Sequence, residues 1–521
     1  MHILFVTSEA TPWSKTGGLA DVCSALPKTL SLLGREVSIV TPYYRCVRDW
    51  FLKNCGEEPE AMYGVTLSAP MGKKECRGGV RKATLDGTNA TVYFIEHNDF
   101  YGREGIYNYQ GVDYADNFQR FAFLSRASLE LIRRLSLEVD IIHVNDWQTA
   151  LVPVYLDTLY RSRSRLDGPS SLGRLAYPKI TDVAGDDAPL FDRIKTVLTI
   201  HNLRHQGRFW RGAMDSLGLD WSLFSYDKME FYGQVNYLKS GVVFSDAITT
   251  VSPQYAQEIQ TKPFGERLQG VLKERANDLF GILNGIDTDE WDPAKDEYLP
   301  ANYDVDHIYP GKSECKARLQ EEVGLPVEPK TPLLGVVSRF DPQKGLDLVA
   351  EVAGNFIEQY GVQFVVLGSG ERELGDRFRG LAYRYPRNFA LRDTFSVALS
   401  HRIEAGSDVF LMPSRYEPCG LNQMYSLRYG TLPVVHNVGG LHDTVVNGSE
   451  ENIRAGIANG FLLYCFSADD MTKALNWTLE LYRHHPDEWQ KMMRTAMNCD
   501  HSWQKSALEY DALYNKLLSK F

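Results

Sequence analysis

The chain has 521 residues, of which 44% are hydrophobic and 24% are charged, and its net charge at pH 7 is -11. This balance is typical of soluble globular proteins, and the length predicts roughly two to four domains. The negative charge argues against a nucleic-acid or anionic-membrane partner, because both attract a surplus of Lys and Arg. A bound phosphate would therefore need a local cluster of cations.

Residues 1–7 are expected to form a strand. They lack the cationic region, the apolar region and the cleavage site of a secretory signal. No apolar run reaches the ~20 residues that cross a bilayer, so a soluble protein is expected. None of the eight cysteines forms a C-x-x-C pair. This scatter favours reduced cysteines over a zinc or thioredoxin-like site.

Short apolar, β-branched runs follow in two series, separated by stretches with helical periodicity such as 117–135. Continuous apolar strands are typical of parallel sheets covered on both faces, and their alternation with helices predicts an α/β fold with doubly wound, Rossmann-like domains. The first series comprises residues 3–7, 36–41, 91–95, 140–144, 196–200 and 247–251, and the second 333–337, 364–367, 409–412 and 432–435.

The change of domain is expected just after residues 282–287, and a polar segment, 300–329, then leads into the second sheet. Residues 161–192 are rich in Arg, Ser, Gly and Asp, which indicates a surface loop. In open α/β sheets, ligands bind beyond the carboxyl ends of the strands. The residues that directly follow the strands are therefore the candidates for function.

The first such cluster is Lys15-Thr16-Gly17-Gly18, which follows the first strand. Two glycines at the start of a helix let backbone N–H groups approach a phosphate at the positive end of the helix dipole. Lys15 adds a cation, and Asp21 is placed to accept sugar hydroxyls. A purely steric role for the two glycines remains the alternative.

The second cluster, Arg339 to Lys344, follows the strand at 333–337. A planar guanidinium and an ammonium suit a diphosphate that gains negative charge as a leaving group. Two solvated surface cations are the alternative interpretation.

Two further clusters follow later strands. Glu417, with Pro418 after it, places a carboxylate near a helix N-terminus. Gly439-Gly440-Leu441 repeats the Gly-Gly turn and predicts a second anion-binding turn.

Other strand ends carry the sequences His143-Val144-Asn145-Asp146-Trp147 and His201-Asn202-Leu203. A lone histidine at a strand end is more often structural than catalytic. The sequence His401-Arg402-Ile403-Glu404 has metal-like residues at helical spacing but no third ligand, so a structural or base-pocket role is favoured. Gly311-Lys312-Ser313 resembles the end of a P-loop, but Asp306 occupies the position of its leading glycine.

Taken in order, these motifs resemble the bacterial glycogen synthases and plant starch synthases. The similarity runs from Met1 to the C-terminal helix, and only 161–192 is foreign to it. The motifs are Lys15-Thr16-Gly17-Gly18-Leu19, Asn145-Asp146-Trp147, His201-Asn202-Leu203, Arg339 with Gln343-Lys344-Gly345, residues 401–406, Glu417-Pro418-Cys419-Gly420-Leu421 and Gly439-Gly440-Leu441.

The resemblance implies a GT-B fold, in which two Rossmann-like domains face each other across a deep cleft. The first would be residues 1–287, the acceptor domain, completed by a C-terminal helix at 501–521. The second, 288–500, would bind the nucleotide sugar. The implied reaction transfers glucose from ADP-glucose to the non-reducing end of an α-1,4-glucan, with retention of configuration and with no metal or other cofactor.

The resemblance also implies roles for individual residues. Arg339 and Lys344 would neutralise the diphosphate, with Lys15 and the amides of Gly17 and Gly18 opposite them. Glu417 would hold the glucosyl ring. His201, Asp146 and Asn284 would contact sugar hydroxyls or the reacting centre. Further donor-binding positions are Asp21, Gln343, Phe395 (against adenine), His401, Gly420, Leu421, Tyr425, Gly439, Gly440 and Leu441, and the acceptor region comprises Tyr107 and Trp147.

The chain departs from the family pattern at three places. Val438 replaces a Ser or Thr, Tyr425 stands where related families carry a second Glu, and Arg204-His205 replaces Ala-Tyr. A related transferase that uses UDP-glucose and a catalytically inactive glucan-binding homologue are the alternatives. The resemblance implies a cytoplasmic location in a bacterium, or the plastid stroma or starch granule for a mature plant or algal form.

Overall fold

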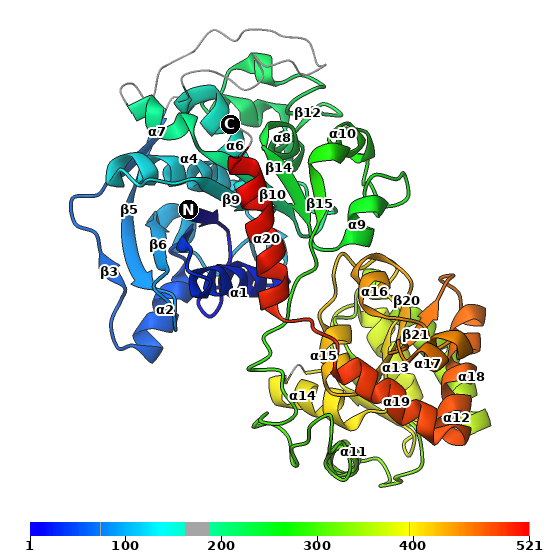
Figure 1. The fold of residues 1–521 in the computed structure, drawn as a ribbon. Coiled ribbons are helices and arrows are strands. Elements are labelled where there is room, and N and C mark those ends of the chain that lie inside the picture. The colour runs from blue at the N-terminus through cyan, green and yellow to red at the C-terminus, as the bar shows by residue number, and fades with distance from the viewer. Residues whose placement is uncertain (73, 162–186, 395, 520–521) are drawn as a thin grey trace. The chain divides into compact units, whose positions relative to one another are not determined.

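The structure of the protein is a computed structural model that describes residues 1–72, 74–161, 187–394 and 396–519. It divides into two compact units (Figure 1). Unit 1 comprises Met1–Val251, Ala256–Ile282 and Ser506–Phe521, and unit 2 comprises Ser252–Tyr255 and Leu283–Lys505. The chain thus leaves unit 1 after Ile282, whereas the sequence placed this boundary after residue 287.

Unit 1 is built on a ten-stranded sheet in the order β15-β14-β10-β9-β1-β2-β6-β5-β3, with β4 paired to β5. The seven strands from β15 to β6 are parallel, and β5 joins antiparallel at one side. The strands are β1 (His2–Val6), β2 (Glu36–Pro42), β3 (Glu60–Ala61), β4 (Leu67–Met71), β5 (Lys74–Thr84), β6 (Thr91–Glu96), β9 (Ile141–Asn145), β10 (Lys195–Ile200), β14 (Ala247–Thr250) and β15 (Leu279–Gly281).

Helices cover this sheet, and the helix predicted over 117–135 is confirmed as α4 (Asn117–Leu135). The others are α1 (Gly18–Leu32), α2 (Arg45–Asn54), α3 (Asn98–Tyr101), α5 (Asp146–Thr149), α6 (Leu151–Tyr155), α7 (Ala188–Asp192), α8 (Tyr237–Phe244) and α10 (Gln269–Glu274), while α9 (Pro253–Glu258) begins in unit 2 and ends in unit 1. A small sheet of β11 (Arg208–Trp210), β13 (Gln234–Asn236) and β12 (Glu230–Phe231) and a hairpin of β7 (Asn108–Tyr109) and β8 (Val112–Asp113) complete the unit. Most of the predicted surface loop, 162–186, lies outside the described residues.

The C-terminal helix α20 (Trp503–Leu518), red in Figure 1, returns the chain to unit 1. Asp511 accepts two hydrogen bonds from Arg35, at 2.7 and 2.8 Å. Tyr514 contacts the ring of His143 on β9, with 2.7 Å between Oη and Nδ1. His143 is 1% exposed, so it serves as a structural histidine that fastens this helix to the sheet.

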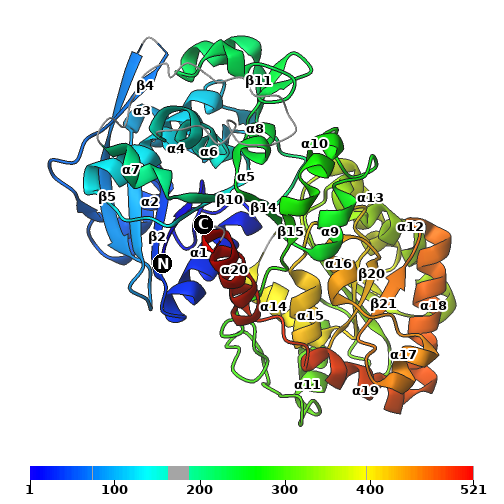
Figure 2. The same cartoon turned by 45° about the horizontal axis from the view of Figure 1, so that its top comes forward.

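Unit 2 is built on a six-stranded parallel sheet in the order β18-β17-β16-β19-β20-β21, of which β20 and β21 are labelled in Figure 2. Its strands are β16 (Leu333–Val337), β17 (Gln363–Leu367), β18 (Phe389–Arg392), β19 (Val409–Met412), β20 (Leu432–His436) and β21 (Phe461–Leu463). Its helices are α11 (Gly311–Glu322), α12 (Leu346–Tyr360), α13 (Arg372–Arg384), α14 (Val397–Gly406), α15 (Asn422–Arg428), α16 (Gly439–Thr444), α17 (Glu450–Ala455), α18 (Ala468–His484) and α19 (Pro486–Met497).

Successive residues of one strand in unit 2 enter two different hydrophobic cores. Phe364 and Val366 of β17 pack with α12, α18 and α19, while Val365 and Leu367 pack with Leu319 of α11 and Ile403 of α14. Because side chains alternate between the two faces of a strand, an apolar run is buried on both sides only when helices cover both faces. The predicted doubly wound architecture is therefore confirmed in this unit.

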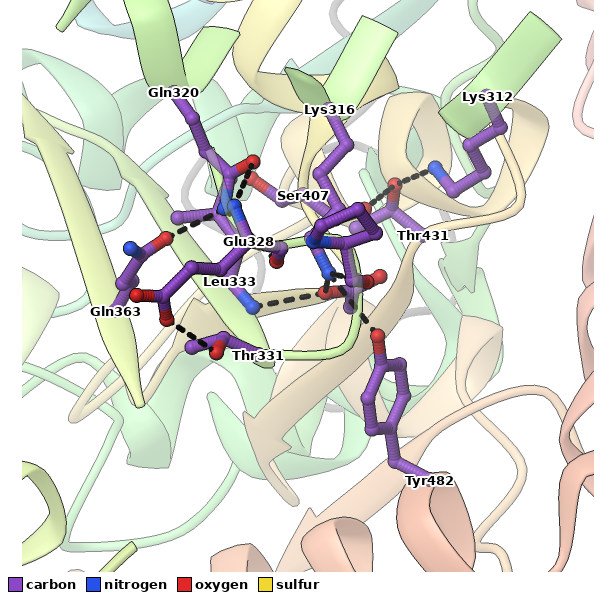
Figure 3. A network of polar contacts seen from close by, with 12 residues as sticks. Lys312, Lys316, Gln320, Glu328, Thr331, Leu333, Gln363, Ser407, Thr431 and Tyr482 are labelled. Carbon is purple, nitrogen blue, oxygen red and sulfur yellow. Dashed lines mark hydrogen bonds and ion pairs between the residues drawn. The ribbon is translucent and has the colours of Figure 1, made fainter. Parts of the chain in front are cut away.

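The segment at 300–329 contains α11, whose polar residues Lys312, Lys316 and Gln320 lie on one face at helical spacing (Figure 3). Lys316 Nζ lies 2.6 Å from Asp408 Oδ2, and Lys312 Nζ lies 2.6 Å from Thr431 Oγ1. Burial lowers the pKa of Lys312 to about 8. These contacts tie α11 to the amino ends of the strands, which explains the P-loop-like Lys312 as a structural residue.

Candidate active site

One candidate cluster lies in unit 1, at the carboxyl ends of the neighbouring strands β1, β9 and β10. The loop after β1 exposes Lys15, Thr16, Gly17 and Gly18, and α1 begins at Gly18. A Cβ added at Gly17 or Gly18 would meet nothing within 4 Å. Lys15 Nζ lies 2.7 Å from Oδ1 of Asp21 in the first turn of α1. The start of α1 is therefore open to solvent beside a cation, as an anion site requires.

Asp146 follows β9 in a left-handed backbone conformation, with φ of 53°. Its carboxylate accepts a hydrogen bond from the backbone N–H of His201 at 2.7 Å. Burial raises the pKa of Asp146 to about 7, although backbone N–H groups of His201 and Asn202 oppose the rise and the charge of Glu9 adds to it. Burial disfavours the charged carboxylate, so this group titrates near neutral pH.

His201 follows β10 and lies beside Asp146. Its Nε2 is 2.9 Å from Oδ1 of Asn145, an amide oxygen that accepts. Nε2 therefore carries the proton, which leaves Nδ1 as an acceptor. Burial lowers the pKa of His201 to about 3, so the imidazole is neutral at physiological pH.

The two residues predicted for the acceptor region also belong to unit 1. The indole of Trp147 is half-buried and packs on Phe121 and Phe209, with ring centroids 5.1 and 5.7 Å away. The hydroxyl of Tyr107 lies 2.5 Å from Oε1 of Glu9. Glu9 was missed by the sequence reasoning, although its position three residues beyond β1 was a usable signal.

A second cluster lies in unit 2, at the carboxyl ends of the neighbouring strands β16, β19 and β20. Glu417 is 5% exposed and accepts hydrogen bonds at Oε2 from Lys344 Nζ, at 2.7 Å, and from Ser414 Oγ, at 2.9 Å. Gln343 donates to the carbonyl of Tyr416 at 3.2 Å, which fixes the neighbouring backbone. Residues that are 73 positions apart in sequence thus form one ion pair.

Arg339 follows β16 in the same cluster and is exposed. Its guanidinium forms no ion pair with any residue that the structure describes. It is therefore available to an anionic ligand, in contrast to the partly buried Lys344, whose ammonium is already paired with Glu417.

The second Gly-Gly turn is packed against this cluster. A Cβ at Gly439 would lie 1.9 Å from the carbonyl oxygen of Glu417, and one at Gly440 would lie 2.1 Å from that of Cys419. The N–H of Gly440 donates to the Glu417 carbonyl at 3.1 Å, and Leu441 behind it is fully buried. The expectation of a second anion-binding turn is thus wrong for Gly440, because its amide already has a backbone acceptor.

Three further predicted residues belong to unit 2: Asn284, and Gly420 and Leu421, which follow Glu417 in the sequence. Asn284 is 6% exposed, and its Oδ1 has no hydrogen-bond partner among the described residues. Gly420 has φ of 74°, a conformation that favours glycine. Leu421 caps the start of α15. A buried acceptor without a donor is costly, which makes Asn284 Oδ1 a suitable partner for a ligand hydroxyl.

His401 and Tyr425 lie on the two sides of Trp291, a residue that the sequence reasoning did not select. The indole stacks on the imidazole at 3.8 Å and on the phenol at 3.7 Å, measured between ring centroids. His401 is 0% exposed and pairs with Asp296 through Nδ1 at 2.8 Å. It therefore has no surface through which to contact a donor directly. Phe395 lies outside the described residues.

Within the described ranges, no group of three or more His, Cys, Asp and Glu side chains is placed to hold a metal ion. Among the described residues, no helix is both long and apolar enough to cross a membrane. The cluster of unit 1 offers an exposed lysine and an open helix start for an anion, and a neutral histidine beside a buried aspartate. The cluster of unit 2 offers an exposed arginine and a carboxylate that is paired with a lysine.

Comparison with known proteins gives full-length matches. The sequence model described as "Starch synthase catalytic domain" matches residues 2–172 and 177–274, and that of "Glycosyl transferases group 1" matches 319–495. Residues 161–192 are therefore largely covered by the first of these, and the prediction that they are foreign to the family is wrong. Glycogen synthases from Anaeromyxobacter sp. (strain Fw109-5) and Thermotoga petrophila are 44% and 42% identical, over 99% and 100% of this chain and 99% of each relative.

The solved structures agree with the sequence comparison. The catalytic domain of starch synthase IV from Arabidopsis thaliana, bound to ADP and acarbose, is 32% identical and superposes with a TM-score of 0.82 over 100% of this chain and 99% of its own. Sucrose-phosphate synthase from Thermosynechococcus elongatus, 15% identical with a TM-score of 0.57, shares the fold alone. The predicted GT-B fold is confirmed. The chain belongs to the family of bacterial glycogen synthases and plant starch synthases, and it is a glycosyltransferase.

Proposed function

We propose that the protein transfers glucose from ADP-glucose to the non-reducing end of an α-1,4-glucan, with retention of configuration. The observation that carries the proposal is the cluster of unit 2, where the exposed Arg339 follows β16 in the same segment as Lys344, and Lys344 pairs with Glu417 beyond the neighbouring strand β19. The starch synthase IV structure with ADP and acarbose, and relatives named glycogen synthase, support the same donor and acceptor.

In this proposal the diphosphate binds beside Arg339 and Lys344. When the bond between glucose and phosphate breaks, negative charge accumulates on the departing ADP, and two preorganised cations stabilise it. Glu417 keeps Lys344 in place and accepts hydrogen bonds from the glucosyl hydroxyls. This arrangement supplies the electrostatic stabilisation from side chains alone, so we propose that no metal ion takes part.

Asp146 and His201 of unit 1 contact the sugar hydroxyls. The neutral imidazole offers Nδ1 as an acceptor, while the buried carboxyl of Asp146 is held by the backbone amides after β10. Neither group is a free carboxylate suited to attack at C1, and Glu417 is engaged by Lys344. We therefore favour departure and attack on the same face of the sugar. The anomeric bond to phosphate breaks, the bond to the acceptor oxygen forms, and the acceptor proton passes to the departing phosphate.

A radiolabel transfer assay tests this proposal. Labelled ADP-glucose and UDP-glucose are each offered with glycogen or maltoheptaose, and transfer from ADP-glucose to both acceptors is expected. Turnover with UDP-glucose alone would refute the proposed donor. Glucan binding without transfer from either donor would support the inactive homologue instead.

Two variants control this assay. We expect Glu417→Gln to abolish most of the transfer while the far-ultraviolet circular dichroism stays unchanged, because it weakens the contacts of Lys344 and the sugar. Glu451→Gln, an exposed glutamate in the first turn of α17, is expected to match the parent.

A further inference from the structure

Glu9 follows β1 at the centre of the unit 1 sheet and is 2% exposed. Its carboxylate receives three hydrogen bonds. Oε2 accepts from the backbone N–H of Thr16, while Oε1 accepts from the Thr16 hydroxyl at 2.7 Å and from the Tyr107 hydroxyl at 2.5 Å. The side chain of Glu9 thus connects the segment of Thr16 with that of Tyr107.

The direction of the hydrogen bonds around Tyr107 follows from the chemistry of its neighbours. Tyr107 donates its single phenolic proton to Oε1 of Glu9. Ser8 Oγ lies 2.7 Å from the same phenolic oxygen and must therefore donate to it. Burial and the nearby charge of Glu9 raise the pKa of Tyr107 well above its usual value, so this proton is retained.

Glu9 forms no ion pair with any described residue. A buried carboxylate without a cation is expensive, and apolar or neutral side chains would fill the same space at lower cost. Both of its partners adjoin residues proposed to bind substrate: Thr16 lies between Lys15 and Gly17, and Tyr107 lies in the predicted acceptor region. Glu9 itself is too deeply buried to reach a polymer.

We propose that Glu9 is a positioning residue that holds the anion-binding loop at Lys15–Gly18 and the acceptor-region Tyr107 in one fixed arrangement. The proposal rests on the proposed function, since the loop is assigned to the donor and Tyr107 to the acceptor. A single buried carboxylate then preorganises the groups for both substrates, so its loss weakens donor and acceptor binding together.

The test compares Glu9→Gln with Glu130→Gln. Glu130 is also buried, at 1% exposure, and also accepts a tyrosine hydroxyl, that of Tyr160 at 2.6 Å, but it lies on α4 outside the cluster. Gln has one acceptor oxygen where Glu has two, so in Glu9→Gln the side chain cannot accept from the Thr16 N–H and from the two hydroxyls at once. We expect KM to rise about tenfold for both ADP-glucose and maltoheptaose in Glu9→Gln, and for neither in Glu130→Gln.

A second pair of variants avoids the core. Thr16 is exposed, so Thr16→Val removes one hydroxyl donor with little effect on folding, and Thr16→Ser restores it. Thr16→Val is expected to raise the KM for ADP-glucose several-fold without changing that for maltoheptaose, and Thr16→Ser is expected to match the parent. Wild-type KM values for both substrates in Glu9→Gln, or no rescue by Thr16→Ser, would overturn the proposal.

Amide hydrogen exchange separates this inference from the proposed function, because it needs no turnover. The Thr16 amide is expected to exchange at least about tenfold faster in Glu9→Gln than in the parent and in Glu130→Gln. Faster exchange with no transfer activity in the parent would refute the proposed function but retain the positioning role. Unchanged exchange at Thr16 would refute the role of Glu9 even in an active transferase.

Discussion

The two units use the same Gly-Gly-Leu sequence at the start of a helix in opposite ways. In unit 1, Gly17 and Gly18 are exposed, and an added Cβ at either would touch nothing within 4 Å. In unit 2, Gly439 and Gly440 are buried, and an added Cβ would overlap the carbonyl oxygens of residues 417 and 419. The first pair leaves space for a ligand, and the second lets two backbone segments pack together.

The clusters next to these turns differ in charge as well. Unit 2 holds a lysine and a glutamate 2.7 Å apart, and a second, exposed cation, Arg339, lies in the same segment after β16 as the lysine. In unit 1 the exposed Lys15 pairs with Asp21, and two further carboxyl groups, those of Glu9 and Asp146, are buried and form no ion pair with a described residue. Unit 2 is therefore the better place to stabilise a departing diphosphate, whereas unit 1 is suited to hydrogen-bonding a sugar.

Replacing the lysine of each unit should give the largest contrast. We expect Lys344→Ala to lower kcat by roughly 10²- to 10³-fold, because it removes a cation from the leaving group and leaves Glu417 buried without its partner. Lys15→Ala, which removes an exposed lysine, should raise the KM for ADP-glucose by about tenfold and change kcat little. Steady-state kinetics with both variants measure this, and equal effects on kcat would contradict the division of roles.

The glycines provide the second contrast. Gly440→Ala is expected to lower the free energy of unfolding by about 2–3 kcal/mol, because its Cβ would overlap the backbone at Cys419. Gly18→Ala should change that free energy by less than about 0.5 kcal/mol, yet weaken ADP binding about tenfold, since a methyl group then faces the ligand. Urea denaturation and calorimetric titration with ADP test the pair. A stable Gly440→Ala variant would show that the second turn is not a packing device.

The smallest effect concerns Asp146, whose pKa is about 7 in the folded protein against an ordinary value of 3.8. Between these values the folded protein keeps a proton that the unfolded chain releases, so this group lowers the free energy of unfolding as pH rises. Asp146→Asn removes the effect. The free energy of unfolding of Asp146→Asn minus that of the parent should therefore be larger at pH 8 than at pH 5, by about 2 kcal/mol. A pH-independent difference in urea denaturation would show that Asp146 is ionised throughout this range.

Much of the fold could be predicted because the relevant signals are local. The strands at 333–337 and 409–412 and the helix at 117–135 appear with the predicted bounds. The polar residues chosen at strand ends lie near one another for a related reason, since parallel strands bring their carboxyl ends to one edge of a sheet. Lys344 and Glu417 were selected separately in this way, and the structure joins them.

Other residues could not be assigned from local signals. His401 seemed a candidate for the base pocket, but Trp291, 110 positions earlier, covers it. The Gly440 amide seemed free for an anion, but it donates to the carbonyl of Glu417. Glu9 follows a strand end but belongs to no motif, and the structure shows that Tyr107, 98 positions away, donates to it. In each case the deciding partner is distant in sequence.

The sequence by itself determined the family, the α/β class and the strand ends at which polar residues gather, because these depend on periodicity and on short motifs. Only the tertiary structure decided which of those residues are open to a ligand and which are consumed by packing. That distinction depends on burial and on hydrogen bonds between residues far apart in the chain. The Gly-Gly-Leu segment of unit 1 is therefore open to solvent, whereas the identical segment of unit 2 packs against the backbone of residues 417 and 419.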